Sequence, residues 1–314
     1  MNVDPGHPSV VLAHGAVQML VYLPDPSTGF YRGPRFDWSG VIGRIECGGH
    51  TWFGRWKTAP HDACANDDVT GTAGEFGMGT FNMPAPLGYE EARPGEAFLK
   101  IGVGELRRID VAPYGFSRPY PVVRPAPWNT AQGAGWIEFR QTAGDCRGYA
   151  YHYTQRIAIS VSQPGFVIRQ TLQNTGRRRV AQTHYCHNFT IVDDALMGPN
   201  YEVAFPFPVA LDNPSDALIA AKGSTLRFLR EMAPNEAFFS TLRGFNPVAA
   251  HNGVEIRNLT TGAGIRFTGD RPPVRFHLFA TARCLCPEPF VDVSLSPGEA
   301  TEWTTNYELL TEPR

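Results

Sequence analysis

The sequence predicts an all-β fold of mostly antiparallel sheets with very little helix, and three observations support this. Short runs that alternate apolar and polar residues recur along the chain, as in half-buried strands. Glycine (32 residues) and proline (27 residues) are abundant between these runs. Only residues 234–240 have the composition of a short helix, which Asn235 would cap. Many short strands between turns are typical of a sandwich, and 314 residues indicate a large one.

The most regular strand patterns occur in pairs, which predicts β-hairpins. Residues 156–161 and 166–173 flank the turn sequence SQPG, and residues 254–259 and 264–267 flank TTGA. Two more strands are expected near the end of the chain, over residues 274–280 and 301–309.

Two other segments, residues 60–98 and 112–135, are rich in glycine and proline and have no strand period. Loops of that length in a compact domain usually serve a function. We therefore expect both segments to form the walls of a cleft.

Composition and charge exclude several classes of protein. The chain has 28 basic and 30 acidic residues, a net charge of −2, so it has no overall field that attracts nucleic acid. The N-terminus lacks the basic start and apolar stretch of a signal peptide. No apolar run approaches the roughly 20 residues of a membrane span. We expect a single domain over residues 1–314 in the cytoplasm, monomeric or homodimeric, with no nucleic-acid or membrane partner.

The ligand-forming residues do not predict a metal site. The six cysteines show no repeated metal spacing, and Cys284 and Cys286 would share one face of a strand. His61 and Asp62, followed by Asp67 and Asp68, resemble a loop for a hard metal ion. Such loops are also common turns, and no glycine-punctuated calcium pattern follows. We expect free thiols, no metal and no cofactor.

Two short segments about a hundred residues apart carry the chemistry. Residues 183–189 (THYCHNF) end a strand pattern and offer an imidazole beside an amide and aromatic rings. Residues 286–290 (CPEPF) interrupt another strand pattern and hold a carboxylate, Glu288, between two prolines. One group can donate a proton and the other can accept one. His184 and His187 are three residues apart, so they should point to opposite faces of a strand.

Several segments spread over nearly the whole chain resemble proteins of the galactose mutarotase-like, aldose 1-epimerase-related family. They are residues 29–40 (GFYRGPRFDWSG), 74–77 (GEFG), 86–89 (PLGY), 98–104 (FLKIGVG), 187–189 (HNF), 286–290 (CPEPF) and 296–299 (SPGE). The resemblance is to a divergent branch of the family. It implies a β-supersandwich with a carbohydrate cleft on the concave face of one sheet.

The resemblance also implies the roles of individual residues. His187 matches the family's catalytic acid and Glu288 its base. A second histidine and an arginine usually hold the sugar, and His61, His152 or His184 would replace that histidine here. The residues expected to bind the carbohydrate are Arg32, Arg35, Asp37, His61, Asp62, Glu75, Tyr89, Lys100, His152 and Asn188. Aromatic faces for the sugar would come from Trp38, Tyr89, Tyr151, Tyr153 and Phe189.

The implied reaction interconverts the anomers of a sugar. Glu288 would take the proton of the anomeric hydroxyl while His187 protonates the ring oxygen. If the two act from opposite sides of the ring, their polar atoms should lie about one pyranose ring apart.

Alternatives remain at each level. His187 can be a core histidine, and Glu288 can be a charge on an edge strand that its prolines keep unpaired. Arg32, Arg35 and Asp37 can form an internal salt bridge. The same fold can carry a lyase or hydrolase, or a sugar-binding protein without activity.

Overall fold

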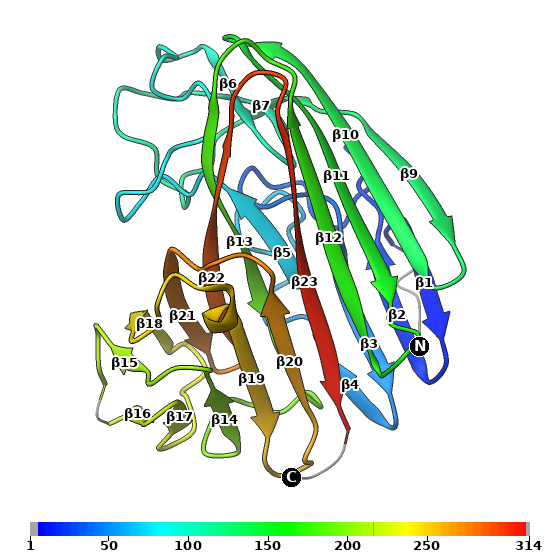
Figure 1. The fold of residues 1–314 in the computed structure, drawn as a ribbon, viewed down its shortest axis with the longest axis vertical. Helices are drawn as coiled ribbons and strands as arrows, with labels where there is room; N and C mark the ends of the chain where they lie inside the picture. The colour runs from blue at the N-terminus through cyan, green and yellow to red at the C-terminus, as the bar shows by residue number, and fades with distance from the viewer. Residues whose placement is uncertain (1–5, 216, 312–314) are drawn as a thin grey trace.

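The computed structural model describes residues 6–215 and 217–311, and these form four antiparallel sheets (Figure 1). Every strand pairing among these residues is antiparallel, as the sequence predicts. The only helical segment in the same residues is a short 3-10 turn, Ala249–His251. No helix among them is long and apolar enough to cross a membrane.

The largest sheet has ten strands and forms the front of the molecule in Figure 1. In spatial order its strands are β16 (Ile219–Lys222), β17 (Thr225–Phe228), β14 (Tyr201–Ala204), β19 (Gly253–Asn258), β20 (Gly264–Gly269), β23 (Ala300–Leu310), β12 (Gly165–Asn174), β11 (Tyr149–Ile159), β10 (Trp136–Cys146) and β9 (Trp128–Gly133).

A second sheet of six strands lies behind it. Its order is β15 (Ala210–Leu211), β18 (Ala237–Arg243), β21 (Arg275–Thr281), β22 (Cys284–Leu295), β13 (Val180–Phe189) and β5 (Gly71–Phe76). The N-terminal part forms a four-stranded sheet of β1 (Ser9–His14), β2 (Val17–Tyr22), β3 (Val41–Cys47) and β4 (His50–Trp52). A small three-stranded sheet contains β6 (Ala97–Lys100), β7 (Gly104–Arg107) and β8 (Val122–Pro125).

The pattern of burial along the strands shows how the two large sheets are layered. In β12, Phe166, Ile168, Gln170 and Leu172 are buried and alternate with more exposed residues, so this strand has one face toward the core and one toward solvent. In β13 nearly every residue is buried, which means that both faces of the six-stranded sheet are covered. One face packs on the ten-stranded sheet, and loops cover the other.

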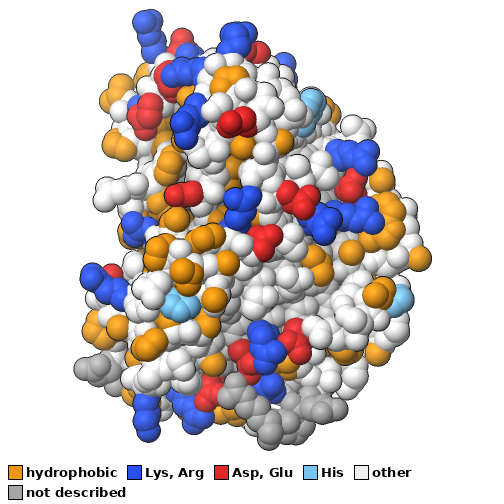
Figure 2. Space-filling view, viewed as in Figure 1, with side chains coloured by type: hydrophobic (Ala, Val, Ile, Leu, Met, Phe, Trp, Pro, Cys, Tyr) orange, Lys and Arg blue, Asp and Glu red, His pale blue; other side chains and the backbone are white. Residues whose placement is uncertain are grey.

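The outer face of the ten-stranded sheet carries mixed charges rather than a patch of one sign (Figure 2). Glu138 pairs with both Arg140 and Arg156, and Arg266 bridges Glu255 and Glu308. Exposed pairs of this kind each add little to stability. Their alternation agrees with the near-zero net charge of the sequence.

Both hairpins and both late strands predicted from the sequence are confirmed. The first hairpin is β11–β12 and the second is β19–β20. The late strands are β21 and β23.

The helix predicted over residues 234–240 is wrong. Residues Ala237–Arg243 form β18, which pairs with β21. Phe238, Ser240 and Leu242 are buried in alternation, and this period of two outweighs the helical composition. The expectation that residues 60–98 and 112–135 are loops throughout is also wrong, because they contain β5, β8 and β9.

Trp52 joins the four-stranded sheet to the ten-stranded sheet. Its side chain is fully buried, and its indole nitrogen donates to the carbonyl of Gly264 on β20 (2.7 Å). Truncation would leave a large cavity and an unpaired carbonyl in the main core. The tryptophan therefore holds two sheets in place at once.

We predict that Trp52→Ala lowers the free energy of unfolding by about 3–5 kcal/mol, measured by urea denaturation. Trp136→Ala is the matched control, because Trp136 is half-buried and stacks under the Arg156 guanidinium (3.7 Å) near the surface. The control should cost less than about 2 kcal/mol. Equal losses in the two variants would contradict the role given to Trp52.

Candidate functional site

The candidate site lies where the hydrogen-bonded ladder between β13 and β22 is interrupted. The regular ladder ends at the pair His184–Val291. An isolated bridge further along, between Thr190 and Leu285, keeps the same register. Counting along this register places His187 directly opposite Glu288.

Two prolines explain the interruption. Leu285 exchanges two backbone hydrogen bonds with Thr190, the residue that follows β13, and alternate residues of a strand direct their backbone groups to the same side. The nitrogens of Pro287 and Pro289 therefore face β13 but carry no hydrogen to donate. The expectation that CPEPF interrupts a strand is wrong, because β22 runs through both prolines. It is also an inner strand, so Glu288 is not an edge-strand charge.

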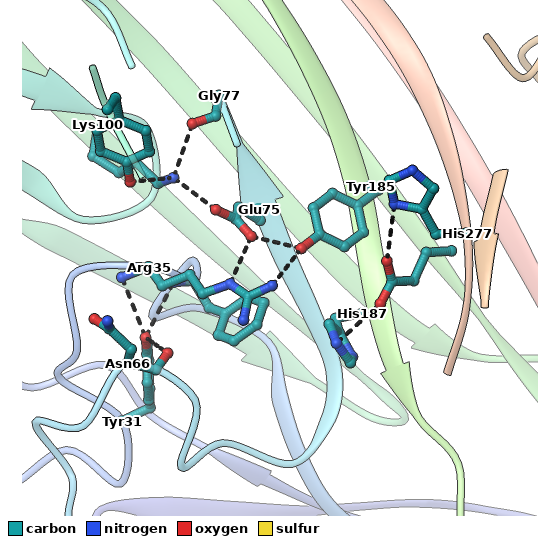
Figure 3. A network of polar contacts seen from close by, with 12 residues as sticks. Tyr31, Arg35, Asn66, Glu75, Gly77, Lys100, Tyr185, His187 and His277 are labelled. Carbon is teal, nitrogen blue, oxygen red and sulfur yellow. Dashed lines mark hydrogen bonds and ion pairs between the residues drawn. The ribbon is translucent and has the colours of Figure 1, made fainter. Parts of the chain in front are cut away.

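Glu288 lies between two histidines on one face of the sheet, and Figure 3 shows the contacts that join it to both. His187 Nε2 is 2.9 Å from Oε1 of Glu288, and His277 Nδ1 is 3.8 Å from Oε2. His277 is also the residue opposite Glu288 in the β21–β22 ladder. The expected separation of about one pyranose ring is therefore wrong, because His187 and Glu288 are in direct contact.

His277 differs electrostatically from an exposed histidine. Its side chain is fully buried, and burial lowers its pKa to about 4, although the charge of Glu288 opposes the shift. The rings of Phe81 (4.9 Å) and Phe239 (5.0 Å) pack edge-on against it. His277 is therefore neutral at neutral pH and adds no positive charge beside Glu288.

A buried polar network adjoins this row of residues (Figure 3). Arg35 donates from Nε to Glu75 (2.9 Å) and from Nη2 to the Tyr185 hydroxyl (2.9 Å). Tyr185 in turn donates to Glu75 (2.6 Å), and Lys100 donates to the other oxygen of Glu75 (3.0 Å). Both oxygens of Glu75 are thus held by charged or hydroxyl donors.

The charges in this network affect one another. Burial alone disfavours the ionised form of Glu75, but the charges of Lys100 and Arg35, with hydrogen bonds from Tyr185 and Arg35, lower its pKa overall. Burial lowers the pKa of Lys100, and its pairing with Glu75 only partly offsets this. The guanidinium of Arg35 also lies between the rings of Phe36 (4.4 Å) and Phe116 (4.3 Å). Arg35 is therefore fixed by ion pairing, hydrogen bonding and stacking together.

A cavity of about 310 Å³ adjoins His187, Glu288 and Arg35. Besides these three it is lined by Asp67 and by the apolar side chains of Trp56, Met78, Phe116, Phe189, Phe239 and Phe279. The segments predicted to form cleft walls supply Asp67, Met78 and Phe116. Asp67 is ion-paired with Lys57.

Three of the residues expected to bind a sugar, Arg35, Glu75 and Lys100, lie together beside the catalytic candidates. Arg35 reaches the cavity itself, and Glu75 and Lys100 hold it from behind. Phe189 is the one expected aromatic residue in the lining.

Other expected residues point away from the cavity, into the space between the two large sheets. Asn188 accepts a hydrogen bond from Tyr307 of β23 (2.9 Å). His184 contacts Gln170 of β12 (3.2 Å), which places it on the opposite face from His187, as predicted. Asp37 lies close to His184 across Gly74, and burial raises its pKa to about 7.

The remaining candidates organise loops or lie on the surface. His61 binds the carbonyl of Phe30 (2.7 Å), and Asp62 accepts from the amide of Cys64 (3.0 Å), as in a turn. Arg32 donates its backbone amide to Ala63 (2.6 Å), and Tyr89 donates to the carbonyl of Ala112 (2.9 Å). His152 is exposed on the outer face of the large sheet.

None of His61, His152 and His184 lines this cavity. The second histidine beside Glu288 is His277, which is buried behind the carboxylate and is not part of the lining. Within residues 6–215 and 217–311, no group of three or more His, Cys, Asp or Glu side chains is arranged to hold a metal ion.

The sequence reasoning missed His277, Tyr185 and the aromatic residues Trp56, Phe116, Phe239 and Phe279. Tyr185 was within reach, since it is two residues from His187 and so shares its face of β13. His277 has no local signal, because only the register of β21 against β22 brings it to Glu288.

The pKa of His184 tests whether this side chain is buried between the two large sheets. Burial lowers its pKa to about 3, from about 6.5 in the unfolded chain. Between these values the unfolded state binds the additional proton, so stability falls as the pH falls from about 6.5 toward 3. We predict that His184→Gln removes up to about 1.4 kcal/mol per pH unit of this dependence, measured by urea unfolding at pH 7 to 4.

The control for that experiment is His152→Gln, which changes the same side chain at an exposed position. Its pH dependence should match that of the unaltered protein. Parallel profiles for all three proteins would show that His184 is not buried in this way.

Comparison with known proteins gives the fold a name. No family model and no curated protein matches the sequence. Solved structures do match along nearly the whole chain. A Synechocystis protein is 14% identical, with a TM-score of 0.62 over 99% of this chain and 100% of its own. A candidate aldose 1-epimerase from Escherichia coli K12 is 11% identical, with a TM-score of 0.60 over 98% and 100%.

A galactose mutarotase-like protein from Clostridium acetobutylicum is also 11% identical, with a TM-score of 0.56 over 98% of this chain and 96% of its own. Sequence identities this low indicate a shared fold and nothing further. The chain has the galactose mutarotase-like fold, the β-supersandwich that the sequence predicted.

Proposed function

We propose that this protein is a carbohydrate isomerase that interconverts the anomers of a sugar, with Glu288 as base and His187 as acid. The observation that carries the proposal is the 2.9 Å contact between these two side chains at the wall of the cavity. The names of the proteins with the same fold, which include a candidate aldose 1-epimerase and a galactose mutarotase-like protein, support the choice of reaction.

Direct contact between acid and base suits this reaction. The two oxygens that exchange protons, the anomeric hydroxyl and the ring oxygen, are bonded to the same carbon. A donor and an acceptor that touch each other can therefore reach both from one side.

In the proposed reaction, the Glu288 carboxylate takes the proton of the anomeric hydroxyl. The imidazolium of His187 gives its proton to the ring oxygen as the bond between that oxygen and the anomeric carbon breaks. The open-chain aldehyde then turns about its adjacent carbon–carbon bond. In the reverse step His187 recovers a proton from the attacking hydroxyl, and Glu288 returns one to the carbonyl oxygen, so protons balance and no cofactor is consumed.

Arg35 and the aromatic walls would bind the sugar. The Arg35 guanidinium is held by Glu75, Tyr185 and two rings, so it presents its remaining N–H donors at small entropic cost. Trp56 and Phe189, which both line the cavity, offer apolar contacts for the C–H groups of a pyranose.

A lyase on the same fold has less support. Such an enzyme removes a proton from carbon with a histidine or tyrosine base. The Tyr185 hydroxyl already donates to Glu75 and accepts from Arg35, so it is not free to act as a base. A sugar-binding protein without activity remains an outcome of the experiment below. The cytoplasmic location, the single domain and the monomeric or dimeric state also stay predictions.

We predict that the protein accelerates anomer exchange of at least one unphosphorylated aldose, measured by saturation-transfer NMR over a sugar panel. Glu288→Gln and His187→Asn should each lower kcat by about 10²-fold or more, because each removes one proton-transfer group. Glu302→Gln, a change to an exposed glutamate on β23, is the control and should retain full activity.

Two results would contradict the proposal. One is full activity in Glu288→Gln. The other is sugar binding, detected by calorimetry, without faster exchange for any sugar, which would identify a binding protein.

A further inference from the structure

The lining of the cavity is mostly apolar. Its polar lining consists of Arg35, Asp67, His187 and Glu288, and its other six lining side chains are apolar. Among the residues that the structure describes, no serine, threonine, asparagine or glutamine lines it. Neutral polar side chains of these types are among the groups that fix the orientation of a polar ligand.

Most of the polar lining is already committed. His187 and Glu288 are used at the anomeric carbon in the proposed reaction. Asp67 is ion-paired with Lys57. Arg35 uses two of its five N–H donors on Glu75 and Tyr185, so it is the one polar residue of the lining with several donors left for a ligand.

The apolar lining is contributed from several directions. The His187 ring stacks on Phe189 (4.1 Å), and Phe189 stacks on Trp56 (5.3 Å), so one side of the cavity is a column of three stacked rings. Phe279 stands edge-on to His187 (5.5 Å) on β21. Phe239 on β18 and Phe116 beside Arg35 add further rings. A ligand in this cavity therefore meets carbon on most sides.

We infer that the preferred substrate is a deoxy sugar, a monosaccharide in which a hydrogen or methyl group replaces a hydroxyl or hydroxymethyl group of the common aldose. This inference rests on the proposed function and adds the substrate class. A free hexose carries a hydroxyl on nearly every carbon, and the cavity has partners for only some of them. Each hydroxyl buried against a ring without a partner loses its bonds to water. A methyl group at the same place contacts the rings favourably.

The test compares matched pairs of sugars that differ by one hydroxyl: D-fucose with D-galactose, 6-deoxy-D-glucose with D-glucose, and L-rhamnose with L-mannose. The Kd of each sugar is measured by calorimetry, and its anomer exchange is measured by saturation-transfer NMR. In at least one pair the deoxy sugar should bind about tenfold more tightly than its parent or better. Its kcat/KM for exchange should be higher by a similar factor.

The inference is overturned if every parent sugar binds as tightly as its deoxy partner, or if no deoxy sugar binds. Failure of the proposed function looks different: deoxy sugars then bind with the expected preference but show no faster exchange. Faster exchange of both members of each pair to the same extent would support the function and refute the substrate class.

A pair of variants tests whether the apolar wall causes the preference. Phe239→Gln places an amide in the wall and should reduce the ratio of parent to deoxy Kd by about fivefold. Phe245→Gln makes the same change at a half-buried phenylalanine that packs on Phe207 and Phe276 and does not line the cavity. The control should keep the ratio of the unaltered protein, and equal ratios in both variants would refute the assignment to the wall.

Discussion

The missing backbone hydrogens of Pro287 and Pro289 are the constraint on which the site depends. An inner strand normally donates to both neighbours, and each proline removes one donor from the ladder toward β13. The pairing of β22 with β21 is intact on the other side, so the strand keeps its register and Glu288 its face. The carboxylate is thereby aligned between His187 and His277 on adjacent strands. A functional side chain is positioned here by strands rather than by loops, which restricts its movement.

Behind His187, Glu288 and His277, the ionised form of the buried Glu75 is stabilised by two cations and a hydroxyl group. Removing a carboxylate and two cations from water is costly, and such pairs often contribute little net stability compared with apolar residues. The network fixes the guanidinium of Arg35 at the cavity, with a ring on each side. A free arginine would lose rotamer entropy whenever it bound a ligand. We therefore infer that the ionic network mainly preorganises Arg35 and contributes little to the stability of the fold.

Local patterns in the sequence predicted what alternation and turns can encode: the all-β class, both hairpins, and the opposite orientation of His184 and His187. The same alternation would have turned Asn188 away from His187, since neighbours on a strand face opposite sides. His277, Phe239 and Phe279 were not predictable in this way. They come near Glu288 through the order of β18, β21, β22 and β13, which depends on contacts far apart in the chain.

The contact between His187 and Glu288 also constrains how the imidazole can act. Stacking on Phe189 (4.1 Å, 14° between planes) and edge contacts with Phe36 and Phe279 leave the ring little freedom to rotate. Nε2 therefore stays beside the carboxylate, and a proton given to a ligand must leave from the side that already faces Glu288. A ligand oxygen has to enter between the two groups or replace one of them as partner. That requirement selects ligands whose exchanging oxygens are close together, as the two oxygens on one anomeric carbon are.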